Sequence, residues 1–168
     1  MKSSFTLIVI AIILFLIAGL IYKFYPIYKQ SISILESHAE LAEVKINEDI
    51  FTVFIADSKE EKKRGLIGHK SLSEKSGMLF IFDAPSVPRF WMKDMQFPID
   101  IIWIYQNQII GWSENATPQP SALNSELIIY YPPSSINMVL ELAAGTVKAS
   151  NLRIGDIVTI KYKNSLQL

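Results

Sequence analysis

The densest group of residues suited to chemistry is the run RFWMKDM, residues 89–95, in the middle of the chain. It places a phenylalanine, a tryptophan and two methionines beside charged side chains of both signs. Ligand sites combine apolar walls with a few placed polar groups, so this run fits the wall of a small-molecule pocket. The alternative is a core strand, in which alternation puts Phe90 and Met92 on one face and Trp91 and Lys93 on the other. Trp91 and Lys93 are therefore the candidate binding residues.

Three further polar residues lie near this run or precede it. Arg64, just before Gly65, is either a second cation for the pocket or an ordinary surface arginine. Asp94 and Asp100 could form a carboxylate pair for acid–base chemistry. In the alternative interpretation, Asp94 caps the turn before Pro98 and Asp100 begins a strand. We include Arg64, Asp94 and Asp100 among the candidate ligand-binding residues.

Other catalytic and metal-binding patterns are missing from the sequence. It has no G-x-S-x-G elbow, no glycine-rich phosphate loop and no H-E-x-x-H motif. The two histidines, His38 and His69, are far apart, and the absence of cysteine excludes thiolate zinc sites and cysteine nucleophiles. We therefore expect no metal and no cofactor, and we favour a protein that is not an enzyme.

Short runs rich in β-branched and aromatic residues predict the strands that would position these side chains. The predicted strands are residues 50–56, 78–82, 90–92, 99–105, 109–112, 138–142 and 157–162. The Gln106-Asn107-Gln108 segment predicts a hairpin turn between the fourth and fifth of these strands.

Two short helices and one long loop complete the predicted domain. Ser58 and Glu61 form a capping box, which predicts a short helix that ends near Gly65. A second short helix is expected over residues 146–151, and residues 113–135 form a proline-containing loop long enough to be functional. Strands and helices do not alternate as in a parallel sheet. The fold class is therefore α+β and β-rich, with a compact antiparallel sheet or partly closed barrel.

The amino-terminal residues 5–22 form an uninterrupted apolar run without charge. A membrane-crossing helix needs about 20 such residues, and the aromatic and basic residues that follow resemble a membrane-interface belt. A cleaved signal peptide is the alternative, although its apolar core would be shorter and a small-x-small cleavage site would follow. We predict a transmembrane anchor over residues 1–25, a spacer over 26–41 and a globular domain over 42–168.

A short amino terminus before a large domain is typical of signal-anchor proteins. We therefore expect a single-pass membrane protein whose globular domain lies outside the cytoplasm, in the cell envelope. Lysine plus arginine and aspartate plus glutamate both number 16, so the chain lacks the basic excess of a polyanion binder. Nucleic acid is not an expected partner.

Six short motifs occur in order and at suitable spacing, and together they resemble a known family. They are RGL (64–66), GMLFIF (77–82), FWMKD (90–94), PIDI (98–101), LELAAG (140–145) and IGD (154–156). The chain resembles the family of domain of unknown function 192, also called uncharacterised protein family 0127, from about Val44 to Tyr162. The resemblance implies a compact β-rich domain, often with a signal sequence or anchor, and no agreed activity.

The chain departs from that family pattern at two places. Asp94 stands where the family usually has asparagine, and the turn at residues 106–108 lacks the usual glycine. Two functions remain open. The first is a membrane-tethered envelope module that binds a small molecule, a glycan or a protein. The alternative is a hydrolase-like envelope enzyme that uses Lys93, Asp94 and Asp100.

Overall fold

The computed structural model describes residues 17–25, 40–120 and 122–163 of the 168-residue chain. Residues 17–25 form a helix in a unit that ends at Ala39, and the chain from Glu40 onward forms a second compact unit, the globular domain. Within the described ranges, no helix has both the length and the apolar content that a membrane crossing requires. Most of the predicted anchor, residues 1–25, and of the predicted spacer, residues 26–41, lies outside the described residues.

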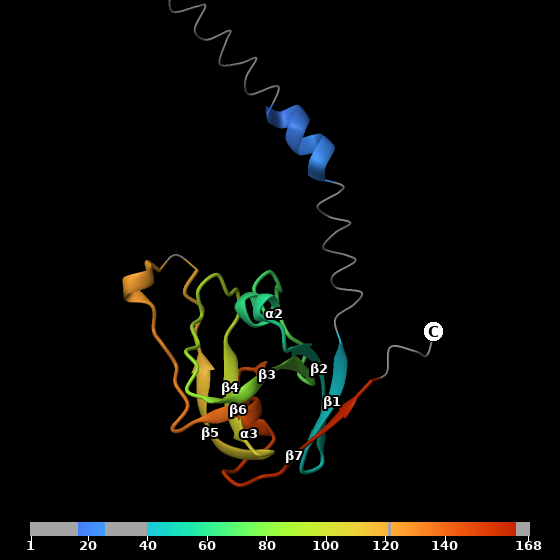
Figure 1. The fold of residues 1–168 in the computed structure, drawn as a ribbon, viewed down its shortest axis with the longest axis vertical. Coiled ribbons are helices and arrows are strands. Elements are labelled where there is room, and N and C mark those ends of the chain that lie inside the picture. Colours follow the sequence, from blue (N-terminus) through green and yellow to red (C-terminus); the bar gives the residue numbers. More distant parts are fainter. Residues whose placement is uncertain (1–16, 26–39, 121, 164–168) are drawn as a thin grey trace, which may run out of the picture. The chain divides into compact units, whose positions relative to one another are not determined.

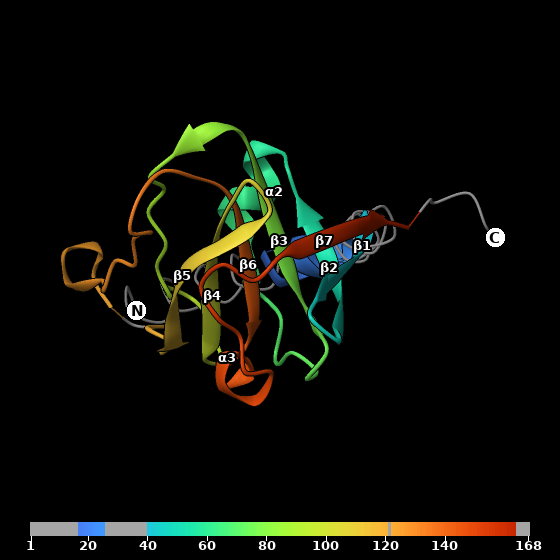
Figure 2. The ribbon, with the colours of Figure 1, turned by 90° about the horizontal axis from the view of Figure 1, so that it is seen from below.

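Seven strands in the described part of the globular domain form one sheet, in the order β5-β4-β6-β3-β2-β1-β7 (Figure 1). They are β1 (Leu41–Ile46), β2 (Asp49–Ala56), β3 (Ser76–Ser86), β4 (Ile99–Tyr105), β5 (Gln108–Ala116), β6 (Ile136–Ala143) and β7 (Val158–Tyr162). Three short helices join them: α2 (Lys59–Arg64), the 3-10 helix η1 (Asn124–Glu126) and α3 (Thr146–Ala149). Viewed along its edge, the sheet curls into a half-barrel (Figure 2).

The predicted β-rich domain with a partly closed sheet is confirmed, but the purely antiparallel arrangement is wrong for one pair. Strands β2 and β3 run parallel, with Thr52 opposite Ser76 and Ala56 opposite Phe80. They are joined by α2, and a crossover that contains a helix is the usual way to connect neighbouring parallel strands. All other pairs in the sheet are antiparallel.

Three elements differ from the sequence-based prediction. Strand β1 was not predicted, and it pairs with both β2 and β7. The long loop contains η1, so the described domain has three helices rather than two. Residues 90–92 form no ladder strand and make an isolated bridge only at Phe90. The hairpin turn is confirmed, and Gln106 and Asn107 both adopt positive φ, which replaces the missing glycine.

The predicted capping box fixes the start of α2. Ser58 Oγ accepts a hydrogen bond from the Glu61 backbone N–H at 3.2 Å, and a Glu61 carboxylate oxygen accepts one from the Ser58 backbone N–H at 3.1 Å. These bonds satisfy donors that the first turn of a helix leaves free. The helix ends at Gly65, whose φ of 50° favours glycine. The chain therefore turns back sharply onto the sheet at Leu66.

The two faces of the curled sheet carry two separate apolar clusters. The inner cluster takes residues from all seven strands: Ala42, Val44, Ile46, Phe51, Val53, Ile55, Leu79, Ile102, Ile104, Ile109, Met138, Leu140, Leu142 and Val158, with Val147 and Leu152. The outer cluster combines residues of the sheet with residues of the loops that cover it: Ala56, Leu66, Met78, Phe80, Met92, Met95, Ile99, Ile101, Trp103, Ala116, Ile136 and Val139. The candidate site lies on this outer face.

Candidate functional site

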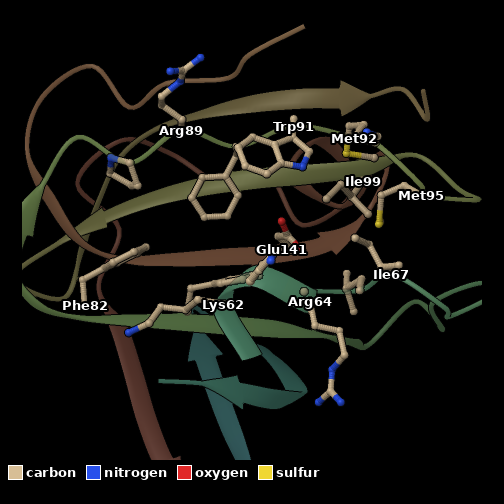
Figure 3. A pocket seen from close by; sticks show the side chains of 17 residues that line it. Lys62, Arg64, Ile67, Phe82, Arg89, Trp91, Met92, Met95, Ile99 and Glu141 are labelled. Carbon is tan, nitrogen blue, oxygen red and sulfur yellow. The ribbon is translucent and has the colours of Figure 1, made fainter. Parts of the chain in front are cut away.

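A cavity of about 290 Å³ opens on the outer face of β3, β6 and β4 (Figure 3). One wall comes from α2 and the turn after it, and the opposite wall comes from residues 88–95. The described lining residues are Lys62, Lys63, Arg64, Gly65, Leu66, Ile67, Phe80, Phe82, Pro88, Arg89, Phe90, Trp91, Met92, Lys93, Met95, Ile99 and Glu141. The volume lies at the small end of the range, roughly 300–1,000 Å³, that is typical of small-molecule sites.

The wall at residues 90–93 is hydrogen-bonded to the long loop rather than to the sheet. Phe90 and Tyr130 exchange two backbone hydrogen bonds of 3.1 and 2.9 Å, and the Gln119 N–H donates to the Met92 carbonyl at 2.9 Å. The Lys93 ammonium also donates to Asn124 Oδ1 in η1 at 2.7 Å. The long loop therefore acts as an outer brace for this wall.

Side chains in this wall alternate between more buried and more exposed positions. Met92 is 1% exposed, whereas Trp91 is 45% exposed. The half-buried Phe90 packs edge-on against Phe80 and Trp103, with ring centroids 5.2 and 5.6 Å away. The alternation expected of a strand therefore holds for burial, although the segment forms no ladder.

Glu141 is a buried acid on the sheet face that underlies the cavity. It lies on β6, opposite Met78 of β3 and Ile101 of β4, and is 6% exposed. Its carboxyl group projects toward the cavity (Figure 3). Burial raises the pKa of Glu141 to about 8, because desolvation disfavours the charged carboxylate. At neutral pH the floor of the cavity therefore carries a mostly uncharged carboxylic acid.

A glycine on the neighbouring strand lets β3 approach the backbone of Glu141 closely. A Cβ atom on Gly77 would lie 2.2 Å from the Glu141 carbonyl oxygen and 2.7 Å from the Leu142 side chain. Any side chain at this position would push β3 and β6 apart. Gly77 therefore keeps the floor of the cavity in place.

Basic side chains surround the cavity opening. Arg64 and Arg89 extend from opposite walls and away from Glu141 (Figure 3). The Lys62 ammonium donates to the Ile81 carbonyl at 2.7 Å. In the part of the chain that the structure describes, no lining cation forms an ion pair with a carboxylate. The positive charge at the opening is therefore not compensated there.

The structure brings together three of the five predicted site residues. Arg64, Trp91 and Lys93 line the cavity, whereas Asp94 and Asp100 do not. Asp94 is exposed and has a φ of 60°. It occupies a turn closed by a 3.3 Å hydrogen bond from the Met95 N–H to the Met92 carbonyl. Asparagine and aspartate both tolerate this left-handed conformation better than most residues, so Asp94 can take the place of an asparagine in this turn.

Asp100 is fully buried on the opposite face of the sheet. Its carboxylate accepts hydrogen bonds from the backbone N–H groups of Asn115, at 2.8 Å, and Val147, at 2.9 Å. These bonds tie β4 to the end of β5 and to the first turn of α3. Lys93, Asp94 and Asp100 therefore do not converge on one concave site.

The sequence-based prediction missed Glu141 as a site residue. The sequence nevertheless contained a signal for this residue. Glu141 interrupts the otherwise apolar run MVLELA, at a position that lies on the same strand face as Val139. Charged side chains are rarely fully buried without a partner, so an acid in such a run indicates a special environment.

Comparison with known proteins identifies the family. The sequence profile of DUF192, described as an uncharacterised ACR, matches residues 42–160. The chain belongs to the DUF192 family. The resemblance of the six sequence motifs is thereby confirmed for the globular domain. No curated protein matches the chain in sequence.

Two solved structures are similar to this DUF192 domain. One is a protein of Sinorhizobium meliloti 1021 described as a transcription regulator, with 28% identity and a TM-score of 0.62 over 71% of this chain and 92% of that one. The other is a protein of unknown function from Novosphingobium aromaticivorans DSM 12444, with 23% identity and a TM-score of 0.62 over 71% of this chain and 83% of that one. The second likeness concerns the fold alone.

Proposed function

We propose that this DUF192 domain is a non-enzymatic binding module that holds a small organic molecule in the cavity between α2 and residues 88–95. The observation that carries this proposal is the cavity itself, because its walls are apolar and aromatic while its opening and floor carry a few ionisable groups. This combination is typical of ligand sites. A small envelope metabolite is the kind of partner that such a site fits.

The lining residues favour binding over hydrolysis. They include no serine, threonine, cysteine, histidine or aspartate, and two of their three lysines, Lys62 and Lys93, are hydrogen-bonded to the Ile81 carbonyl and to Asn124. Glu141 is the only carboxyl group among them, and Asp94 and Asp100 lie elsewhere. The balanced charge of the chain likewise gives no support for extending the description of the S. meliloti protein as a transcription regulator to this domain.

Trp91→Ala is expected to abolish binding without unfolding the domain. The indole is 45% exposed, so its removal should lower the free energy of unfolding by about 1–2 kcal/mol, less than for a fully buried tryptophan. The adjacent Met92→Ala, at a side chain that is 1% exposed, should cost about 2–5 kcal/mol. Saturation-transfer NMR with fragment-sized aromatic compounds measures binding, and denaturant titration measures stability. A library without a single binder that depends on Trp91 would refute the proposed function.

We also propose that residues 5–22 tether the domain to a membrane, with the domain outside the cytoplasm. The support is the uninterrupted apolar length of this run. The full-length chain should remain in the membrane fraction after carbonate washing, with an amino terminus at or near Met1, and deletion of residues 5–22 should release it. A mature amino terminus beyond Ala18 would show instead that the run is a cleaved signal peptide.

A further inference from the structure

We propose that the cavity selects small organic anions whose apolar body carries a hydrogen-bond acceptor away from the anionic group. This inference rests on the proposed ligand-binding function and names the class of ligand. It follows from three features of the site: the charge at the opening, the apolar walls and the buried acid on the floor.

The charge at the opening favours anions and disfavours cations. Five lining residues are basic and one is acidic; the basic ones are Lys62, Lys63, Arg64, Arg89 and Lys93. Lys62 and Lys93 donate to neutral oxygens of Ile81 and Asn124, so these contacts leave their charge uncompensated. Like and opposite charges interact more strongly near a low-dielectric wall than in bulk water. An anionic ligand is therefore attracted to the opening, and a cationic ligand is repelled.

The walls require an apolar body on the ligand. Buried or half-buried apolar side chains line both walls and the sheet between them, namely Leu66, Phe80, Phe82, Phe90, Met92, Met95 and Ile99. Trp91 lies beside the cavity above Glu141 and presents a flat apolar ring with one N–H donor (Figure 3). A ring or short acyl chain could fill this space. A polar ligand body would be disfavoured, because it would lose its hydrogen bonds to water and the apolar walls could not replace them.

The floor requires a hydrogen-bond acceptor. The charged groups that line the cavity with Glu141 come only from the two walls: Lys62, Lys63 and Arg64 on one side, Arg89 and Lys93 on the other. Strands β3 and β4 present apolar side chains to this face, and the Asp100 carboxylate points to the opposite one. In its neutral form Glu141 has an O–H donor. A ligand carbonyl or hydroxyl oxygen can accept this bond.

Four matched aromatic probes separate these requirements. 4-Hydroxyphenylacetate carries an anion and an acceptor, phenylacetate lacks the acceptor, tyramine replaces the anion by a cation, and tyrosol has no charged group. Saturation-transfer titrations use the full-length chain in lipid nanodiscs, with empty nanodiscs subtracted. We expect 4-hydroxyphenylacetate to bind at least about tenfold more tightly than tyramine or tyrosol, and more tightly than phenylacetate.

Three variants assign these preferences to residues. Arg64→Gln combined with Arg89→Gln should remove most of the preference for the anion over tyrosol. Arg153→Gln, at an exposed arginine that does not line the cavity, is the matched control and should retain it. Glu141→Gln keeps a donor but cannot ionise. Above about pH 8, ionisation of Glu141 removes its O–H donor, so the Kd of 4-hydroxyphenylacetate for the natural chain should rise by up to about tenfold per pH unit. In Glu141→Gln the Kd should stay constant.

The outcomes distinguish the ligand class from the binding function. Tyramine or tyrosol binding as tightly as 4-hydroxyphenylacetate, in a manner that Trp91→Ala abolishes, would overturn the ligand class and leave the binding function standing. A pH profile that is identical in the natural chain and in Glu141→Gln would overturn the role of Glu141. Absence of Trp91-dependent binding by all four probes at millimolar concentration would overturn both proposals.

Discussion

Raising the pH from 4.5 to 8 is expected to lower the free energy of unfolding of the globular domain by several kcal/mol, and Glu141→Gln is expected to remove most of this loss. The pKa of Glu141 is about 8 in the folded domain, against an ordinary value of 4.5. Between these values the folded domain holds a proton that the unfolded chain releases. Stability therefore falls by about 1.4 kcal/mol per pH unit, or about 5 kcal/mol over the interval.

The sign of this effect separates Glu141 from the other perturbed acids. Its stabilising contribution is fully present below about pH 4.5 and is lost as the pH rises through 8. By contrast, hydrogen bonding to Ser58 lowers the pKa of Glu61, and hydrogen bonding to Lys75 lowers that of Asp49. The contributions of Glu61 and Asp49 are therefore lost only at more acidic pH. The interval between pH 5 and 8 therefore separates the effect of Glu141 from the effects of Glu61 and Asp49.

Denaturant titrations at a series of pH values measure this effect. Glu48→Gln, at an exposed glutamate in the β1–β2 turn, is the matched control and should keep the full pH dependence of the natural chain. Equal slopes in Glu141→Gln and in the natural chain would show that Glu141 is not the group responsible.

Asp100→Ala is expected to destabilise the domain by about 3–5 kcal/mol. The substitution removes two hydrogen bonds to a carboxylate and leaves the Asn115 and Val147 N–H groups without that partner inside the fold. Asp100→Asn should cost less, because one side-chain oxygen can still accept a bond. Asp94→Asn, in an exposed turn, should change stability by less than about 0.5 kcal/mol.

Chemical denaturation of the four chains decides between structural and functional roles for these aspartates. A cost for Asp100→Ala as small as that for Asp94→Asn would mean that the buried carboxylate does not support the fold. A large cost would confirm that the Asp100 carboxylate joins β4, β5 and α3.

Strong local patterns made parts of the fold predictable. Strand β4, residues 99–105, was predicted with its observed bounds because its sequence is rich in β-branched and aromatic residues. Six of its seven residues are buried, so its environment in the sheet agrees with this local preference. The start of α2 was predictable because a capping box is a contact within four residues. Strand β1 carried a signal that the prediction did not use, because Ala42, Val44 and Ile46 alternate with charged residues as in a half-buried strand. Its pairing with β2 and β7, by contrast, is a property of the whole sheet.

The candidate site was predictable in its residue types but not in its assembly. Trp91 and Lys93 were found because aromatic and charged residues stand side by side in the sequence. The meeting of this segment with Arg64 and Glu141 depends on the parallel pairing of β2 with β3 and on the central place of β6, and neither leaves a local signal. Asp94 and Asp100 were grouped because they are close in sequence, but Asp94 lies in an exposed turn and Asp100 faces the side of β4 opposite to the cavity.

The brace between the wall at residues 90–93 and the loop that carries Gln119 and Tyr130 has an evolutionary consequence. Because backbone groups make its main contacts, these hydrogen bonds survive a change of side chain. The wall itself is less free to change, because Met92 is buried and Phe90 packs against Phe80 and Trp103. We therefore expect sequence divergence within the DUF192 family to concentrate at the exposed positions of the loop, while the wall keeps its FWMKD motif.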